Sequence, residues 1–125
     1  MKVIEAIHEA DNLDPNLYDV QDKIAWLSRL DLRIQKEIFD THKYNEGEEE
    51  IHFTGYGPND TEAVLLVGEP WAEMYVHWLE AQISYHNREY DSFNAANMLF
   101  ESVFSSFANA YHNSHMPNGS RKNYY

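Results

Sequence analysis

The sequence has no cysteine, few basic residues and no long apolar run. Nine Lys and Arg stand against 21 Asp and Glu among its 125 residues, so the net charge is −12. The lack of cysteine excludes disulfides and thiol catalysis and fits a reducing compartment. The negative charge argues against binding of DNA or of an anionic membrane by the bulk of the protein. No apolar segment approaches the length of a membrane span, so no membrane partner is expected.

Glycine is also scarce, and the motifs of common enzymes are missing. There are five glycines, and none forms a phosphate-binding loop or a nucleophile elbow. Glu5-Ala-Ile-His8 has the spacing of a di-iron ligand pair, and Glu73, His77 and Glu80 are the nearest second set. One such match among so many acids and histidines is expected by chance. We therefore expect no enzyme activity, no metal and no cofactor.

Apolar residues recur at three- and four-residue spacing in four segments, which predicts an all-α protein. The first segment covers residues 3–10. The second begins at Asp19-Val-Gln-Asp22, where two acids favour a helix start, and runs to about His42. Its apolar stripe consists of Ile24, Leu27, Leu30, Ile34 and Ile38.

Two further helices are predicted in the second half of the chain. The third opens at Glu69-Pro70, because proline is favoured in a first turn, and the fourth follows a turn at 87–91. The inner face of the fourth helix consists of Phe93, Ala96, Phe100, Val103, Phe104, Phe107 and Tyr111. The pattern predicts a four-helix bundle in one domain, residues 1–112, followed by an extended tail, residues 113–125.

The connection between the second and third helices, residues 43–69, has no helical periodicity. Its segments 51–54 and 63–67 flank a Gly-Pro-Asn-Asp turn, which favours a small β-hairpin. A connection of this length in a small domain is unusual and is often functional.

Charge and aromatic residues are unevenly distributed. All 21 acids and seven of the nine basic residues lie in residues 1–112, which carry −14, whereas the tail carries +2. Tyrosine, tryptophan and arginine are enriched at binding hot spots. We therefore take the tail residues Arg121, Lys122, Tyr124 and Tyr125 as a candidate docking segment. Four aromatics of the body are candidates for a second interface: Phe53, Tyr56, Trp71 and Tyr85.

Three stretches of the sequence together resemble a known family. They are Trp26-Leu-x-x-Leu30-Asp31-x-x-Ile34-x-x-Glu37-Ile38, Glu69-Pro70-Trp71-x-x-x-Tyr75-x-x-Trp78-Leu79-Glu80-Ala81-x-Ile83-x-x-x-Asn87-x-Glu89-Tyr90-x-x-Phe93-Asn94, and Phe104-x-x-Phe107-x-x-x-Tyr111-x-x-x-His115-Met116-Pro117. Their spacing is similar to that of the small head–tail connector (adaptor) proteins of long-tailed bacteriophages and prophages of Gram-positive bacteria.

The resemblance implies a structural virion protein. It would be made in the cytoplasm of the host bacterium and would form a ring, twelvefold in the virion, beneath the portal protein. The ring would extend the DNA channel and would offer a surface to a downstream connector or tail-completion protein. DNA would pass through without specific binding, the tail would dock on the portal, and residues 43–69 would contact a neighbouring subunit or the next layer.

Two other functions remain open from the sequence. The strong acidity also fits a phage-encoded DNA mimic that inhibits a host nuclease, although the acids are scattered over the helix exteriors. The second alternative is a small metal-dependent bundle enzyme. Salt-sensitive inhibition of a nuclease would favour the mimic, bound iron or zinc would favour the enzyme, and co-purification with virions would favour the connector.

Overall fold

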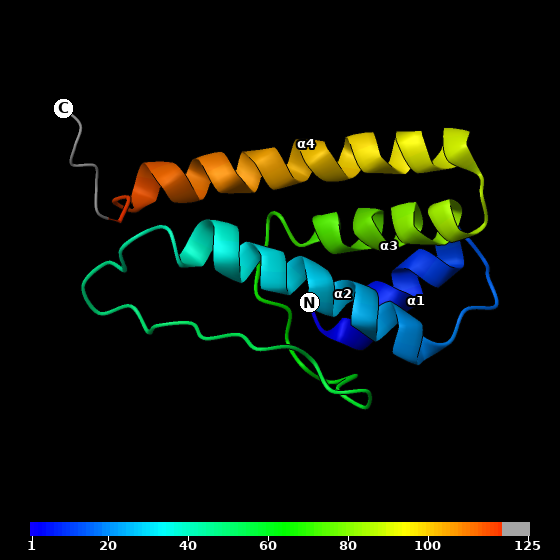
Figure 1. Cartoon of the computed structure of the whole chain (residues 1–125), viewed down its shortest axis with the longest axis horizontal. Coiled ribbons are helices and arrows are strands. Elements are labelled where there is room, and N and C mark those ends of the chain that lie inside the picture. Colours follow the sequence, from blue (N-terminus) through cyan, green and yellow to red (C-terminus); the bar gives the residue numbers. More distant parts are fainter. Residues whose placement is uncertain (119–125) are drawn as a thin grey trace.

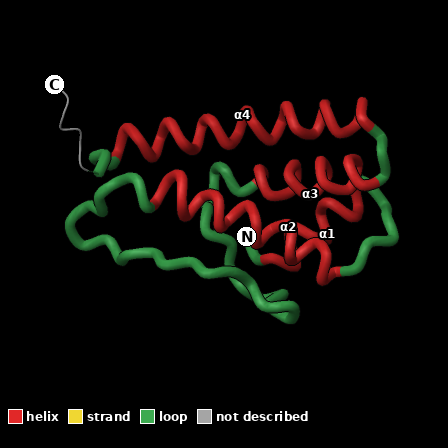
Figure 2. Tube along the Cα trace, in the orientation of Figure 1, coloured by secondary structure: helices red, strands yellow, loops and turns green. Residues whose placement is uncertain are grey.

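The computed structural model describes residues 1–118, and these residues form four α-helices and one π-helical turn (Figure 1). The helices are α1 (Val3–Leu13), α2 (Val20–Ile34), α3 (Glu73–His86) and α4 (Tyr90–Ser114), and the π-helical turn η1 (Gln35–Phe39) continues α2. No β-strand occurs within this part of the chain (Figure 2). The prediction of an all-α fold is confirmed.

Helix α3 occupies the centre of the molecule. It packs against α4 most extensively, and also against α1 and α2. Figure 1 shows α4 lying antiparallel to α3 on one side, with α1 and α2 on the other. The turn between α1 and α2 and the turn between α3 and α4 lie at one end of the molecule, and the C-terminal end of α4 lies at the other.

The core consists of the apolar stripes expected from the sequence. Every member of the predicted stripe from Ile24 to Ile38 is buried, which explains why this amphipathic segment is stable as a helix. On α4, Phe100, Phe104 and Phe107 are buried, so most of the aromatic face of that helix belongs to the core.

The second helix ends slightly earlier than predicted. Regular α-helix stops at Ile34, and η1 extends the helical path to Phe39. The π-helical turn is closed by the Asp40 N–H, which donates to the Gln35 carbonyl at 2.8 Å. Beyond it, the Thr41 hydroxyl donates to a carbonyl of the last turn, so a side chain takes up a free acceptor there and the helix ends.

The predicted start of the third helix at Glu69-Pro70 is wrong. Residues 68–72 form turns, in which the Trp71 N–H donates to the Gly68 carbonyl, and α3 begins only at Glu73. Pro70 therefore lies in the turn that precedes the helix. The preference of proline for a first helical turn did not decide where α3 starts. Residues 68–72 form the turn that connects the long connection to the core, so the helix begins after them.

The β-hairpin expected from segments 51–54 and 63–67 is not formed. Ala63 and Leu65 pair instead with the N-terminus, since the Val3 N–H donates to the Ala63 carbonyl and the Leu65 N–H to the Met1 carbonyl, both at 2.9 Å. In the other segment, the Ile51 carbonyl and the Phe53 N–H bond to the side chain of Gln35 at the start of η1. Each segment thus finds its hydrogen-bond partners elsewhere, so no pairing between the two is needed.

Candidate interaction site

The segment after α4, residues 115–118, is fastened to the turn that follows η1. The Lys43 N–H donates to the Met116 carbonyl at 2.7 Å, and the Asn118 N–H donates to the Thr41 carbonyl at 2.8 Å. We call this segment the C-terminal strap. Because its backbone is paired, the fold defines the position of Asn118, the residue that precedes the basic end of the sequence.

His115 joins the strap to the long connection. Its ring stacks on Tyr111 at 3.8 Å and 4°, and its Nε2 lies 2.9 Å from Glu48 Oε1. The Asn45 N–H, followed by the His115 side chain, lowers the pKa of the Glu48 carboxyl below its usual value. Burial raises the pKa of Tyr111 to about 12. The contacts of His115 therefore tie the beginning of the connection to the end of α4.

A second histidine contact lies beside the strap. His42 Nδ1 lies 2.8 Å from the Ile38 carbonyl, and its Nε2 lies 3.2 Å from His112 Nδ1. Since a carbonyl only accepts, we assign the His42 proton to Nδ1, which leaves Nε2 to accept from His112. This pair links the end of η1 to α4.

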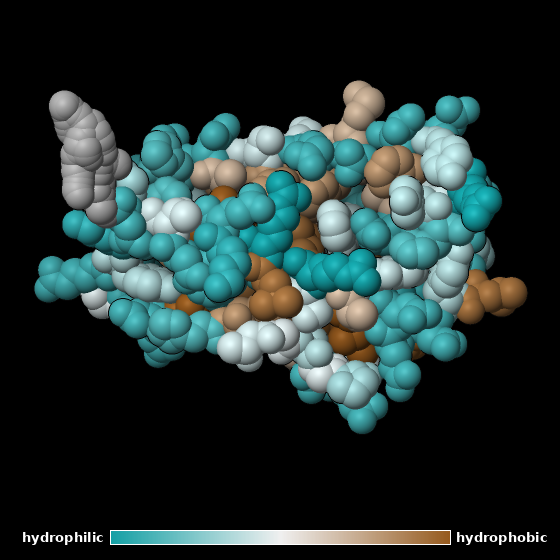
Figure 3. Space-filling view, in the orientation of Figure 1, coloured by the Kyte–Doolittle hydropathy of each residue, from teal (hydrophilic) through white to brown (hydrophobic). Residues whose placement is uncertain are grey.

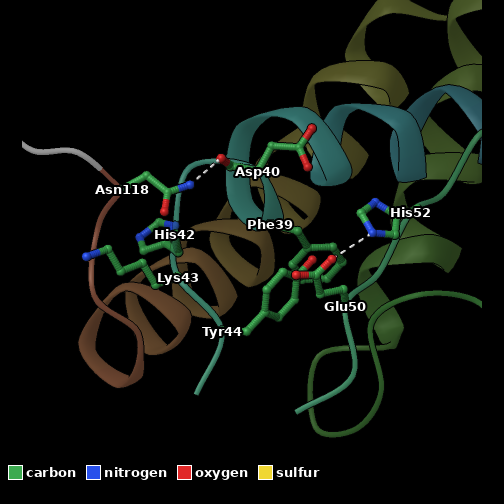
Figure 4. Close-up of a pocket in the computed structure, with 8 residues that line it drawn as sticks. All are labelled: Phe39, Asp40, His42, Lys43, Tyr44, Glu50, His52 and Asn118. Atoms are coloured by element: carbon green, nitrogen blue, oxygen red, sulfur yellow. Dashed lines mark hydrogen bonds and ion pairs between the residues drawn. The ribbon is translucent and has the colours of Figure 1, made fainter. Parts of the chain in front are cut away.

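An open hollow of about 460 Å³ lies next to the strap (Figure 4). Its polar lining includes Asp40, Lys43, His52 and Asn118. Figure 4 shows Asn118 pointing toward Asp40, whose backbone carbonyl accepts its amide at 2.8 Å. The lining carries both signs of charge, which suits contact with a polar protein surface.

Three polar side chains on one face of α2 and the adjoining turn η1 hold the long connection against the helix. They are Ser28, Asp31 and Gln35, which we call the polar stripe. Ser28 Oγ accepts a backbone N–H of the connection at 3.1 Å. Gln35 accepts the Phe53 N–H at 2.9 Å and donates to the Ile51 carbonyl at 2.8 Å. The connection therefore follows α2 in an extended path without forming a strand.

Asp31 is the centre of the polar stripe and is fully buried. Its carboxylate accepts hydrogen bonds from the Tyr56 hydroxyl, from the Tyr75 hydroxyl at 2.6 Å and from the Leu66 N–H at 3.2 Å. The Tyr75 hydroxyl in turn accepts the Val67 N–H at 2.9 Å. One carboxylate thus joins α2, α3 and two points of the long connection.

Burial and hydrogen bonding act on Asp31 in opposite directions. Burial raises the pKa of its carboxyl above the ordinary value, and the three donated hydrogen bonds offset part of that rise. Burial and the nearby carboxylate likewise raise the pKa of Tyr56 and that of Tyr75. Both tyrosines therefore remain protonated donors in the neutral pH range.

The raised pKa of Asp31 predicts a specific dependence of stability on pH. Between the unfolded and the folded pKa, the folded state binds more protons at this site, so its contribution to stability falls as pH rises. The replacement Asp31→Asn removes this contribution. We expect the unfolding free energy of the wild type, relative to that of Asp31→Asn, to fall as pH rises above about 4, the ordinary pKa of an aspartate.

Urea unfolding at several pH values measures this difference. The control is Asp22→Asn, which replaces an exposed aspartate of the same helix. Parallel stability curves for the wild type and Asp31→Asn would contradict a raised pKa at Asp31.

The structure places the predicted interface aromatics in different settings. Tyr85 is 52% exposed. Phe53 and Tyr56 are partly buried with their ring centroids 4.6 Å apart, and Trp71 packs edge-on against Phe107 at 5.7 Å. Of these four, Tyr85 has the largest free surface. The four predicted tail residues, Arg121, Lys122, Tyr124 and Tyr125, lie outside the described residues.

Sequence reasoning missed the polar stripe. Asp31 of α2 and Gln35 at the start of η1 follow Leu30 and Ile34 on the inner side of this helical segment, and all four are buried. The available signal was the presence of polar residues within an apolar stripe. A buried carboxylate needs hydrogen-bond partners, so this pattern indicates that another segment of the chain supplies them. The strap had no comparable signal in the sequence.

Comparisons with protein-family models, with curated proteins and with solved structures found no match. Within residues 1–118, no group of three or more His, Cys, Asp or Glu side chains is placed to hold a metal ion. Among the helices of the same residues, none combines the length and the apolar character needed to cross a membrane.

Proposed function

We propose that this protein is a head–tail connector that forms a ring beneath a phage portal and links the capsid to the tail. In this proposal the four helices form a bundle that serves as the rigid wall of the ring, and the protein has a structural rather than a catalytic role. Ring formation needs a heterologous interface, in which one face of a subunit meets a different face of the next.

The proposal rests mainly on the attachment of the C-terminal strap to the turn that follows η1. Backbone hydrogen bonds from Lys43 and Asn118 hold the strap against the end of η1. The basic, tyrosine-containing residues 119–125 therefore follow a point of the acidic helical body, Asn118, whose position is defined by the fold. A docking segment that starts from a fixed point loses less conformational freedom on binding than one that starts from a loose end.

The acidic body fits the proposed DNA channel. Residues 1–112 carry all 21 acids and only seven basic residues. Like charges repel, so DNA phosphates would pass such a surface without being held. The polar stripe supports the second proposed contact, because it holds the connection at Ile51, Phe53, Tyr56 and Leu66. A segment held in this way would offer a defined surface to a neighbouring subunit or to the next layer.

Removal of residues 119–125 is expected to abolish attachment to portal particles while the body stays folded. The strap remains in this variant, so the hydrogen bonds of Lys43 and Asn118 are kept. Co-sedimentation of the protein with portal particles from the virus or prophage that encodes it measures attachment, and circular dichroism measures folding.

A matched control tests whether attachment depends on the basic residues of the tail or on positive charge anywhere in the protein. Lys36→Ala removes an exposed basic residue of the body and should leave attachment unchanged, whereas Arg121→Ala with Lys122→Ala should weaken it. Full attachment of the protein that ends at Asn118 would overturn the docking role of the tail.

A further inference from the structure

An acidic groove lies at the end of the molecule opposite the strap. It is formed where the end of α1, the last turns of α3 and the first turns of α4 meet, and its volume is about 390 Å³. We define it by six of its lining residues: Asp14, Glu80, Ser84, Glu89, Leu13 and Leu99. The groove is therefore built from three helices and is not the end of a single helix.

Backbone hydrogen bonds at the ends of α1 and α3 fix the chain at two of the three acidic residues of the groove. The Asp14 N–H donates to the Ala10 carbonyl at the end of α1, and the Glu89 N–H donates to the Ser84 carbonyl at the end of α3, both at 2.9 Å. Burial, and then the charges of Glu89 and Glu80, raise the pKa of Asp14. Three like charges thus face one small space.

Basic partners for these carboxylates are few within residues 1–118. Glu80 lies 3.2 Å from His77, and neither Asp14 nor Glu89 forms an ion pair with a described residue. A cation from another molecule would relieve the repulsion among the three carboxylates.

A buried hydroxyl independently points to a ligand in the same groove. Ser84 is 2% exposed and lines the groove, and its hydroxyl makes no hydrogen bond to another described residue. A buried polar group without a partner costs free energy, and a ligand that enters the groove would supply the partner. Beside it, Leu13 and Leu99 are exposed by 66% and 53%, so the rim offers apolar surface to the same ligand.

The sequence contains a segment of matching chemistry. Residues 119–125 hold two basic residues and two tyrosines and no acid. Figure 3 shows apolar surface at the end of the molecule where α1 and α2 join. The segment therefore matches both the charge of the groove and its apolar rim.

Arg121 of one molecule cannot reach the groove of the same molecule. Asn118 is fastened beside the end of η1, and the α4 rise of about 1.5 Å per residue separates Leu99 from Ser114 by about 22 Å. Arg121 is three residues past Asn118, a span of at most about 11 Å. The tail that fits the groove must come from another copy.

We propose that the acidic groove receives residues 119–125 of a second copy of this chain. Arg121 and Lys122 pair with Glu80 and Glu89, and the terminal tyrosines cover the apolar rim. The contact is heterologous, because the tail end of one molecule meets the groove end of the next. The same residues dock on the portal in the proposed function, so the two contacts are alternatives for any one tail. The contact between copies does not require a portal, and so it goes beyond the proposed function.

Sedimentation velocity of the full-length protein, from micromolar to millimolar concentration, tests this proposal. The wild type should self-associate with increasing concentration, and added salt should weaken the association. Glu80→Gln with Glu89→Gln should weaken it at least about fivefold. A control that neutralises two exposed acids of the long connection, Glu46→Gln with Glu49→Gln, should associate like the wild type.

A charge-exchange experiment makes the test independent of any loss of stability. Two double variants exchange the charges: Glu80→Lys with Glu89→Lys in the groove, and Arg121→Glu with Lys122→Glu in the tail. Each variant alone should remain monomeric, and a mixture of the two should associate. A monomeric wild type at all concentrations, or a mixture that stays monomeric, would overturn the proposal. The groove variant should still attach to portal particles, so failure here is distinguishable from failure of the connector function.

Discussion

Replacement of Asp31 by alanine is expected to lower the free energy of unfolding by about 3–5 kcal/mol, because it leaves three buried donors without their acceptor. The carboxylate is fully buried and accepts hydrogen bonds from Tyr56, Tyr75 and the Leu66 N–H. Alanine leaves all three donors without their acceptor in a buried place, and each such donor carries a desolvation cost of about 1–3 kcal/mol. A small domain is stable by only about 5–15 kcal/mol, so the loss would be a large part of the total.

Urea unfolding followed by circular dichroism measures the effect of Asp31→Ala. The control Asp22→Ala changes an exposed aspartate of the same helix and should cost under about 1 kcal/mol. Tyr56→Phe removes one of the three donors and should give a smaller loss of about 1 kcal/mol. If Asp31→Ala cost no more than Asp22→Ala, the carboxylate would not be the attachment point of the long connection.

The second large effect is expected at Trp26. Its side chain is 4% exposed, stacks on His86 at 4.9 Å and meets Tyr18 edge-on at 5.6 Å. Trp26→Ala should therefore lower the free energy of unfolding by about 3–5 kcal/mol, through lost burial and the cavity that remains. The backbone carbonyl of Trp26 still accepts the Trp78 indole N–H in this variant, so the loss reports packing.

The same replacement at Trp71 is the matched control. Trp71 is only partly buried and packs mainly on Phe107, so Trp71→Ala should cost less than Trp26→Ala. Denaturant unfolding of both variants gives the comparison. A loss well under 1 kcal/mol for Trp26→Ala, or equal losses for the two variants, would show that packing around Trp26 contributes little.

The helices were predictable because their signals are local. A stripe such as Ile24 to Ile38 is stable only as a helix with that face buried, and the structure buries all of it. Helix ends were less predictable, because they depend on distant partners. Pro70 favours a helix start, yet α3 begins at Glu73, where the chain has already turned toward the core.

The interaction sites were only partly predictable. Composition separated the basic tail from the acidic body, and the excess of aromatics suggested an interface. Three of the four body aromatics chosen on that basis are partly buried, and the Tyr56 hydroxyl is bonded to Asp31. Surplus aromatics in a sequence do not reveal which of them the fold itself will use.

The sequence by itself determined the all-α class, the faces of the helices and the charge contrast between body and tail. These follow from the periodicity and composition of contiguous residues. Tertiary structure alone decided that Asp31 holds the long connection, that the strap pairs with the end of η1, and that three helices place Asp14, Glu80 and Glu89 around one groove. Each of these joins residues far apart in the chain, and only the packing of whole helices brings such residues together.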